Sequence, residues 1–324
     1  MNVAPTILVA GGGPAGLVAA ATAARLGANV ILCDEQETPG GQLTYRVQPI
    51  ALASGTQAMR PADLAHRLIV AAEGAGVTIY ASTVVAGVYP GFNVLLANPE
   101  RGWSITPDVM IVATGSTDLP FPFSGATLPG VFSARALQIL MHRYRVRPGK
   151  RFVILGGGDL AEELEIDILL AGGDVVWRGM APAHLLRAEG ERGVERFVAG
   201  EATHDADVIV VAVGRQPDAA LTSMAGIEQG FSSLLGGWIP RVDESLRCLN
   251  SRMVVAGDAA GAGDVYAAML EGQIAGESAA ALAGLATAGS SEAKAMSEFV
   301  RRHELRASLD YFYSQPPSEG TFYA

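Results

Sequence analysis

The stretch TILVAGGGPAGLVAAATAARLGANVILCD, residues 6–34, decides the fold. A short β-branched run leads into the glycines Gly11, Gly13 and Gly16, an alanine-rich segment follows, and a second apolar run ends at Asp34. The first glycine permits a tight turn, the second lets a pyrophosphate approach the backbone, and the third allows a helix to pack closely on a strand. A carboxylate at the end of the second strand is typical of ribose binding. The stretch therefore predicts a βαβ unit that binds an adenine dinucleotide at the helix N-terminus.

The composition predicts a compact folded chain with two domains. Of its 324 residues, 49% are hydrophobic and 17% are charged, unlike the composition of disordered chains. The formal net charge of −10 disfavours nucleic acid and anionic lipid as partners. No apolar run reaches the roughly 18 residues that a membrane span requires, and no basic segment precedes the first apolar run, so we expect a cytoplasmic protein.

Side chains that could carry out chemistry by themselves are scarce. The two cysteines, Cys33 and Cys248, are far apart and form no CxxC motif. This excludes a redox dithiol, a cysteine zinc site and an iron–sulfur cluster held by this chain alone. No catalytic nucleophile, metal-ligand cluster or acid–base pair stands out in the sequence. Such a pattern is typical of a protein whose cofactor performs the reaction.

The opening pattern returns in RFVILGGGDLAEELEIDILLAGGDVVWR, residues 151–178, with Gly156 and Gly158 in the glycine turn. This copy is poorer. Asp159 competes with a phosphate for the amides of the helix start, and the second strand ends at Arg178 instead of a carboxylate. Arg178 could meet a 2′-phosphate or simply be solvated. Since only residues 179–207 precede the next buried strand, we expect a shortened domain, and NAD(P) binding there stays open.

Two further strand ends point to ligand contacts. The run DVMIVATGS, residues 108–116, is a buried strand that closes on a turn of small residues, where strands of a parallel sheet meet ligands. A later strand ends at Gly257 and Asp258 just before a long helix that begins near Val265. Asp258 either accepts hydrogen bonds from a ligand's hydroxyl groups or caps a turn.

Together these motifs resemble the superfamily of flavoproteins with two dinucleotide-binding domains, to which thioredoxin reductase and lipoamide dehydrogenase belong. The resemblance implies an α/β fold of two Rossmann-like, three-layer ββα domains, the second inserted in the first and shortened. The predicted parts are 1–118 and 246–324 for the FAD domain, with the C-terminal helix and tail, and 119–245 for the NAD(P)-type domain.

The same resemblance implies which residues hold FAD. They come from the first glycine turn, the loop PGGQL, the strand ends and the start of the last long helix: Gly11, Gly13, Pro14, Ala15, Gly16, Asp34, Glu35, Gly41, Gln42, Leu43, Val85, Ala113, Thr114, Gly115, Gly257, Asp258, Tyr266 and Ala267. A second nucleotide site would use Gly156, Gly158, Asp159 and Arg178.

A narrower resemblance rests on GGQLTYR (40–46), VYPGFNVLL (88–96) and PFPFSGATLPGV (120–131). These segments are similar to the FAD-bearing subunits of multi-subunit amine and imino-acid dehydrogenases, such as opine oxidase, hydrogen cyanide synthase, D-hydroxyproline and L-proline dehydrogenases and the sarcosine oxidase large subunit. Thioredoxin reductase itself is excluded, because SARALQIL (133–140) stands where its CxxC should be.

The narrower resemblance implies an FAD-dependent oxidoreductase that acts on CH–NH donors within a complex. A partner flavin subunit would oxidise the amino or imino acid, and this subunit would transfer electrons. Many such subunits continue into a cysteine-rich [2Fe–2S] module where this chain ends at Ala324. We therefore expect an iron–sulfur centre, if the complex has one, on a small partner subunit.

Two other functions fit the same sequence. The retained second glycine turn and Arg178 would suit a stand-alone NAD(P)H-dependent reductase of a small acceptor such as ferredoxin or quinone. Alternatively, the chain could be a non-catalytic docking subunit that only holds FAD, with the aromatic tail after Leu309 buried against a partner or against its own core.

Overall fold

The computed structural model describes residues 4–50, 57–233 and 235–285. Its larger sheet has five parallel strands in the order β19-β7-β1-β2-β3. β1, β7 and β19 are almost wholly buried, because layers on both faces cover the sheet and favour continuous apolar runs. The strands are β1 (Thr6–Ala10), β2 (Asn29–Cys33), β3 (Thr78–Tyr80), β7 (Val109–Val112) and β19 (Met253–Val255).

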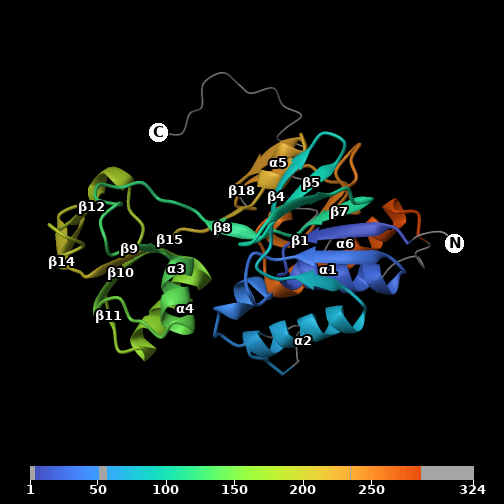
Figure 1. Ribbon diagram of the computed structural model, residues 1–324. Coiled ribbons are helices and arrows are strands. Elements are labelled where there is room, and N and C mark those ends of the chain that lie inside the picture. Colours follow the sequence, from blue (N-terminus) through green and yellow to red (C-terminus); the bar gives the residue numbers. More distant parts are fainter. Residues whose placement is uncertain (1–3, 51–56, 234, 286–324) are drawn as a thin grey trace, which may run out of the picture.

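Helices α1 (Pro14–Arg25) and α6 (Val265–Leu282) pack against each other, with α2 (Pro61–Gly74) beside α1 (Figure 1). Small residues allow the close approach of α1 and α6. A Cβ atom on Gly272 of α6 would lie 2.3 Å from the carbonyl oxygen of Ala15 in α1. Helix α6, from the last described part of the chain, thus packs on α1 in the first unit.

An antiparallel sheet forms the third layer of this unit. It contains β4 (Val84–Tyr89), β5 (Asn93–Ala97) and β6 (Gly102–Ile105). Its buried side chains Val94 and Leu96 share one apolar cluster with Leu8 and Met110 of the parallel sheet. Helices, parallel sheet and antiparallel sheet are therefore stacked in the predicted ββα order.

The second unit repeats this plan on a smaller scale (Figure 1). A parallel sheet in the order β11-β10-β15-β9 lies between helices and the antiparallel sheet β12-β13-β14. The segment 179–207 provides that antiparallel sheet. The elements are β9 (Val131–Ser133), α3 (Ala134–Gln138), η2 (Ile139–Arg143), β10 (Arg151–Gly156), α4 (Gly158–Leu170), β11 (Asp174–Gly179), η3 (Ala183–Leu185), β12 (Leu186–Glu189), β13 (Arg196–Ala199), β14 (Ala202–Asp205) and β15 (Val208–Ala212).

The chain passes between the units on two antiparallel strands, β8 (Ser116–Asp118) and β16 (Arg215–Pro217). The predicted α/β fold, with a smaller Rossmann-like unit inserted in a larger one, is confirmed. The boundaries at 118 and 245 remain a proposal. The segments that follow β16 contact β4 and the turn η4 (Gly257–Ala260), which favours an end of the insertion nearer to Gly214. They are α5 (Ala220–Met224), β17 (Gln229–Ser232) and β18 (Gly237–Pro240).

Candidate cofactor site

The first glycine turn joins β1 to α1 and packs on the neighbouring strand end. Gly11 has a φ of +101°, and a Cβ atom there would lie 2.3 Å from the carbonyl oxygen of Ala113. A Cβ atom on Gly16 would lie 1.9 Å from the carbonyl oxygen of Gly11. Neither position has room for a side chain, so the turn and the helix contact both depend on glycine. Gly13 faces Gly41 of the short helix η1 (Gly41–Thr44), and both line a cavity beside the start of α1.

Asp34 holds this turn in place from within the protein. Its Oδ2 accepts a 2.6 Å hydrogen bond from the backbone N–H of Gly12, and its Oδ1 accepts one of 2.7 Å from Gln36. Burial raises the pKa of the Asp34 carboxyl, and the two backbone N–H groups oppose that rise. A side chain on Gly12 would collide with this carboxylate, which explains the middle glycine of the GGG run. Glu35, the next residue, is exposed and lines the cavity, so it has the freer carboxylate for a ligand.

The cavity has a volume of about 570 Å³, within the range of small-molecule sites. It reaches from the carboxyl end of β2 to the carboxyl end of β19, and it continues onto the second unit at α3. The predicted residues that line it are Gly11, Gly13, Pro14, Ala15, Asp34, Glu35, Gly41, Gln42, Val85, Ala113, Thr114, Gly115, Gly257 and Asp258. Sequence segments more than 200 residues apart thus meet in one cavity.

Four predicted residues lie outside the lining. Gly16 packs behind the turn, and Leu43 is fully buried against Leu64 and Ala65. Tyr266 and Ala267 belong to the first turn of α6, where the Ala267 N–H donates to the capping carboxylate of Asp264 at 2.7 Å. Their neighbours Val265 and Ala268 line the cavity instead. Contact of these four with a cofactor remains a prediction.

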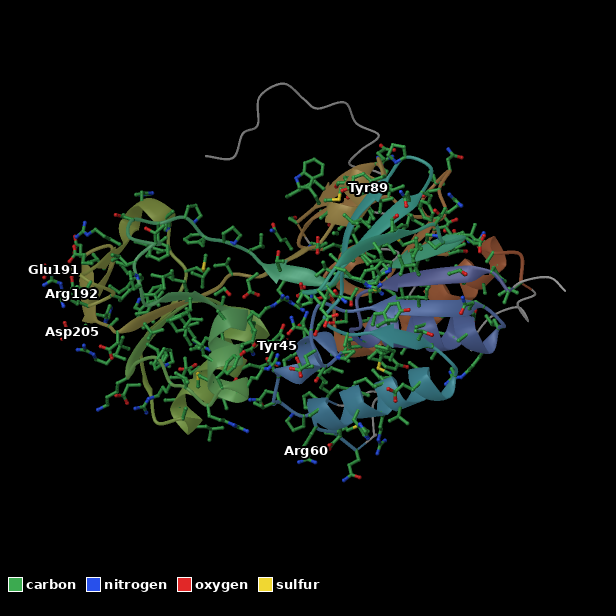
Figure 2. All side chains as sticks on the ribbon, viewed as in Figure 1. Tyr45, Arg60, Tyr89, Glu191, Arg192 and Asp205 are labelled. Carbon is green, nitrogen blue, oxygen red and sulfur yellow. The ribbon has the colours of Figure 1, made fainter. Side chains whose placement is uncertain are left out.

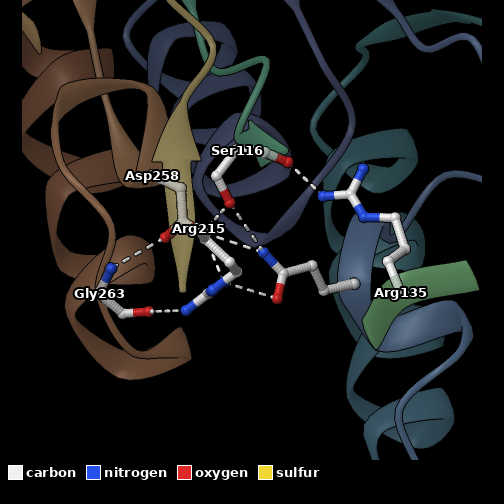
Figure 3. A network of polar contacts seen from close by, with 6 residues as sticks. Ser116, Arg135, Arg215, Asp258 and Gly263 are labelled. Carbon is white, nitrogen blue, oxygen red and sulfur yellow. Dashed lines mark hydrogen bonds and ion pairs between the residues drawn. The ribbon is translucent and has the colours of Figure 1, made fainter. Parts of the chain in front are cut away.

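Asp258, in the turn η4 (Gly257–Ala260), is the centre of a polar network at the other end of the cavity (Figure 3). Its Oδ2 accepts hydrogen bonds from Ser116 Oγ at 2.7 Å, Gln42 Nε2 at 2.9 Å and Arg215 Nη1 at 2.7 Å. Its Oδ1 accepts from the backbone N–H of Gly263 at 3.1 Å. The carboxylate thereby joins η1, both connecting strands and the loop before α6.

Sequence reasoning missed the part of the lining that the second unit and the connecting strands contribute. Among these residues are Ser116, Thr117, Arg135, Ile139, Arg143 and Arg215. Arg135, Ile139 and Arg143 are spaced by four residues, as neighbours on one helix face are. That spacing could have indicated a shared helix face in the sequence. Only the packing of the two units shows that this face meets the cavity.

A group of polar contacts fixes the second unit against the loop after η1. Tyr45, in that loop, lies between the two units (Figure 2). His142 Nδ1 is 2.7 Å from the carbonyl oxygen of Tyr45, and His142 Nε2 is 3.2 Å from Asp167 Oδ2 in α4. Gln48 donates to the other oxygen of Asp167 at 3.0 Å, and Arg46 pairs with Glu163 of the same helix. Because both ring nitrogens of His142 face acceptors, both contacts are satisfied only by the protonated ring.

The docking of the two units is therefore expected to depend on pH. The hydrogen bond to Asp167, aided by the Tyr45 carbonyl and opposed by burial and by Arg145, raises the pKa of His142 above its ordinary value of 6.5. The stability this adds is fully present below that ordinary value and is lost as pH rises through the raised pKa. We expect His142→Gln to flatten this decline in the thermal midpoint above about pH 6.5, whereas substitution of the exposed His66 should not. An unchanged decline in His142→Gln would contradict this role.

The second glycine turn has a different environment from the first. Gly156 packs on β15, since a Cβ atom there would lie 2.1 Å from the carbonyl oxygen of Ala212. Gly158 and Asp159 are exposed at the start of α4, outside the cavity described above. Arg178 pairs with Glu165 of α4 at 3.0 Å. The turn is built like a nucleotide-binding turn. Arg178, the residue that could meet a 2′-phosphate, is already paired with Glu165.

The cysteines offer no redox chemistry of their own. Cys33 and Cys248 are both free and buried, and burial raises the pKa of each thiol to about 12. Within the described ranges, no cluster of three or more metal-ligating side chains occurs, and no helix is long and apolar enough to cross a membrane.

Residues 5–177 match the family model described as pyridine nucleotide-disulphide oxidoreductase. The match covers more than half of the chain, and the chain belongs to this family of flavin-type oxidoreductases. Members typically bind FAD. This chain departs from the disulphide chemistry in the family's description, because its two cysteines cannot form a dithiol centre.

Among individual proteins, an opine oxidase subunit of Rhizobium meliloti (strain 1021) is 26% identical over 96% of this chain and 78% of its own length. The alpha subunit of sarcosine oxidase from the same organism is 34% identical, over 52% of this chain but only 18% of its own length. L-proline dehydrogenase from P. horikoshii has a similar fold, with a TM-score of 0.76 and 24% identity over 94% of this chain and 59% of that one. These distant likenesses agree with the resemblance inferred from the sequence.

Proposed function

We propose that the cavity holds one FAD. The first glycine turn and the start of α1 would bind its phosphates, and Glu35 would accept from the adenosine ribose. Gln42 and Asp258 would lie at the flavin and its sugar-alcohol chain. The observation that supports this most is the continuous cavity, which joins an adenine-dinucleotide turn at one end to a buried polar network at the other.

Individual residues of the lining suit the parts of FAD. Gly13 and Gly41 leave backbone, not side chains, beside the amides of the α1 N-terminus, where an anion is stabilised. Glu35 is exposed to the cavity as a hydroxyl acceptor, whereas the Asp34 carboxylate already accepts two backbone hydrogen bonds. The apolar side chains of Val85, Leu221 and Met224 complete the wall.

We further propose that the chain is the electron-transferring FAD subunit of a complex that oxidises an amino or imino acid. FAD supplies the capacity to take up and release electrons. The chain itself binds the cofactor, orients it and shields it from water between the two units. Two findings support this role: relatives that are named as subunits of opine and sarcosine oxidases, and the missing dithiol.

Anaerobic reduction of the flavin in the purified complex tests this function. We expect sarcosine, proline or an opine to bleach the visible absorbance of the chain's flavin when the partner subunits are present. The isolated chain is the control and should not respond to the amine. Rapid bleaching by NADH or NADPH, with no response to any amine in the complex, would contradict the proposal.

The stand-alone NAD(P)H-dependent reductase remains the second candidate, because the turn at Gly158 is exposed and has open space around it. The Arg178–Glu165 pair and the use of α4 in docking disfavour it. The third candidate, a docking role without catalysis, rests on the aromatic tail, which lies outside the described residues. The reduction experiment separates the first two, and a flavin that no donor reduces would favour the third.

A further inference from the structure

One wall of the cofactor cavity comes from the inserted unit. α3 continues into a turn of π-helix, η2, closed by the Tyr144 N–H donating to the carbonyl of Ile139 at 3.2 Å. Such turns often occur at functional sites. Arg135 and Arg143 line the cavity from this segment, with Ile139 between them.

Within the described part of the chain, the two arginines of this wall, Arg135 and Arg143, are not paired with neighbouring carboxylates. Arg46 and Arg215 also line the cavity, but they pair with Glu163 and Asp258. For Arg135 and Arg143, by contrast, no carboxylate of the described residues lies within ion-pair distance. Arg135 donates to the carbonyl oxygen of Ser116, which fixes it near the flavin end. The Arg143 guanidinium contacts only the neutral Gln36 amide and the Tyr144 ring among the described residues, so its charge is available to an anion.

The position of Arg143 is set by contacts at the adenosine end of the cavity. Its Nη1 donates to Gln36 Oε1 at 3.3 Å, and Gln36 Nε2 donates to Glu35 Oε1 at 3.3 Å. The preceding residue, His142, is fixed between Tyr45 and Asp167, which holds η2 against the loop of the first unit. Arg143 thus contacts the loop that follows β2 through Gln36, which in turn contacts Glu35.

We propose that Arg143 binds the phosphates of the dinucleotide that the first unit holds, so that both units together form the cofactor site. The inference rests on the proposed FAD site, and it adds a residue of the inserted unit to it. A guanidinium is well suited to a phosphate, because it offers several N–H donors in one plane. Docking of the second unit and retention of FAD are coupled through this contact.

Titration of the apo-protein with FAD, followed by flavin fluorescence at low and high salt, tests this inference. We expect Arg143→Gln to raise the Kd for FAD about tenfold or more at low salt and to weaken its salt dependence, because a charge-assisted contact is lost. Arg143→Lys, which keeps the charge, should lose less. ADP carries the same phosphates and should compete with FAD. Its affinity should fall in Arg143→Gln together with that of FAD.

Arg192→Gln is the matched control. It removes the same charge from the far end of the same unit and should leave the Kd unchanged (Figure 2). Equal Kd values for the wild type, Arg143→Gln and Arg192→Gln would overturn the inference while leaving the FAD site intact. A wild-type chain that binds no FAD would overturn the proposed function itself.

Discussion

Gly16→Ala is expected to abolish FAD binding and to destabilise the protein by more than about 3 kcal/mol, because the new methyl group has no space. It would lie 1.9 Å from the carbonyl oxygen of Gly11 and 3.3 Å from the Cβ of Ala113. Relief requires α1 to move away from β1. That movement is opposed on the other side of the helix, where Gly272 of α6 packs directly on the Ala15 backbone.

Gly74→Ala is the control for this substitution. Gly74 ends α2, has no unusual φ, and a Cβ atom there would meet nothing within 4 Å. Alanine should be neutral or slightly stabilising at that position. Urea unfolding and the flavin content of the purified proteins measure both effects. A Gly16→Ala protein as stable and as flavin-loaded as the wild type would show that the turn does not have the packing described here.

Asp258→Ala is expected to cost about 3 kcal/mol of unfolding free energy and to raise the Kd for FAD at least tenfold. Asp258 is 8% exposed and accepts from three side chains and one backbone N–H. Its removal leaves Arg215, 25% exposed, without a carboxylate, and leaves Ser116 and Gln42 without their shared acceptor. The strands that connect the units would lose their common anchor.

A double-mutant cycle with Arg215→Ala tests the cause of that loss. If the unpaired arginine carries much of the cost, the double variant will be more stable than the sum of the two single changes implies. Asp63→Ala, which breaks an ion pair on the surface of α2, should change neither stability nor Kd measurably. Full additivity would mean that Arg215 and Asp258 act independently, which their 2.7 Å contact makes an unexpected result.

The sequence predicts well what local steric rules decide. Glycine is required at Gly11 and Gly16 whatever the rest of the chain does, so the turn could be inferred from spacing alone. For Asp258 the position at a strand end just before a helix left both a ligand contact and a turn cap open, and only the resemblance favoured the ligand contact. The parallel strands can be predicted from apolar runs such as TILVA, because a parallel sheet covered on both faces favours continuous apolar strands.

What depends on the packing of distant segments could not be predicted. The sequence does not show that Asp34 is committed to the Gly12 amide, which leaves Glu35 as the freer acceptor. Nor does it show that α4 presents Glu163 and Asp167 to the first unit, or that Arg143 reaches the loop after β2. These contacts follow from the docking of the two units, and no short motif encodes that geometry.

Titration of the wild-type apo-protein with FAD tests the central claim most directly. We predict saturable quenching of flavin fluorescence at one FAD per chain, with binding lost in Gly16→Ala and weakened in Asp258→Ala. Binding of no flavin, or equal binding by these variants and the wild type, would contradict the assignment of the cavity between the two units as an FAD site.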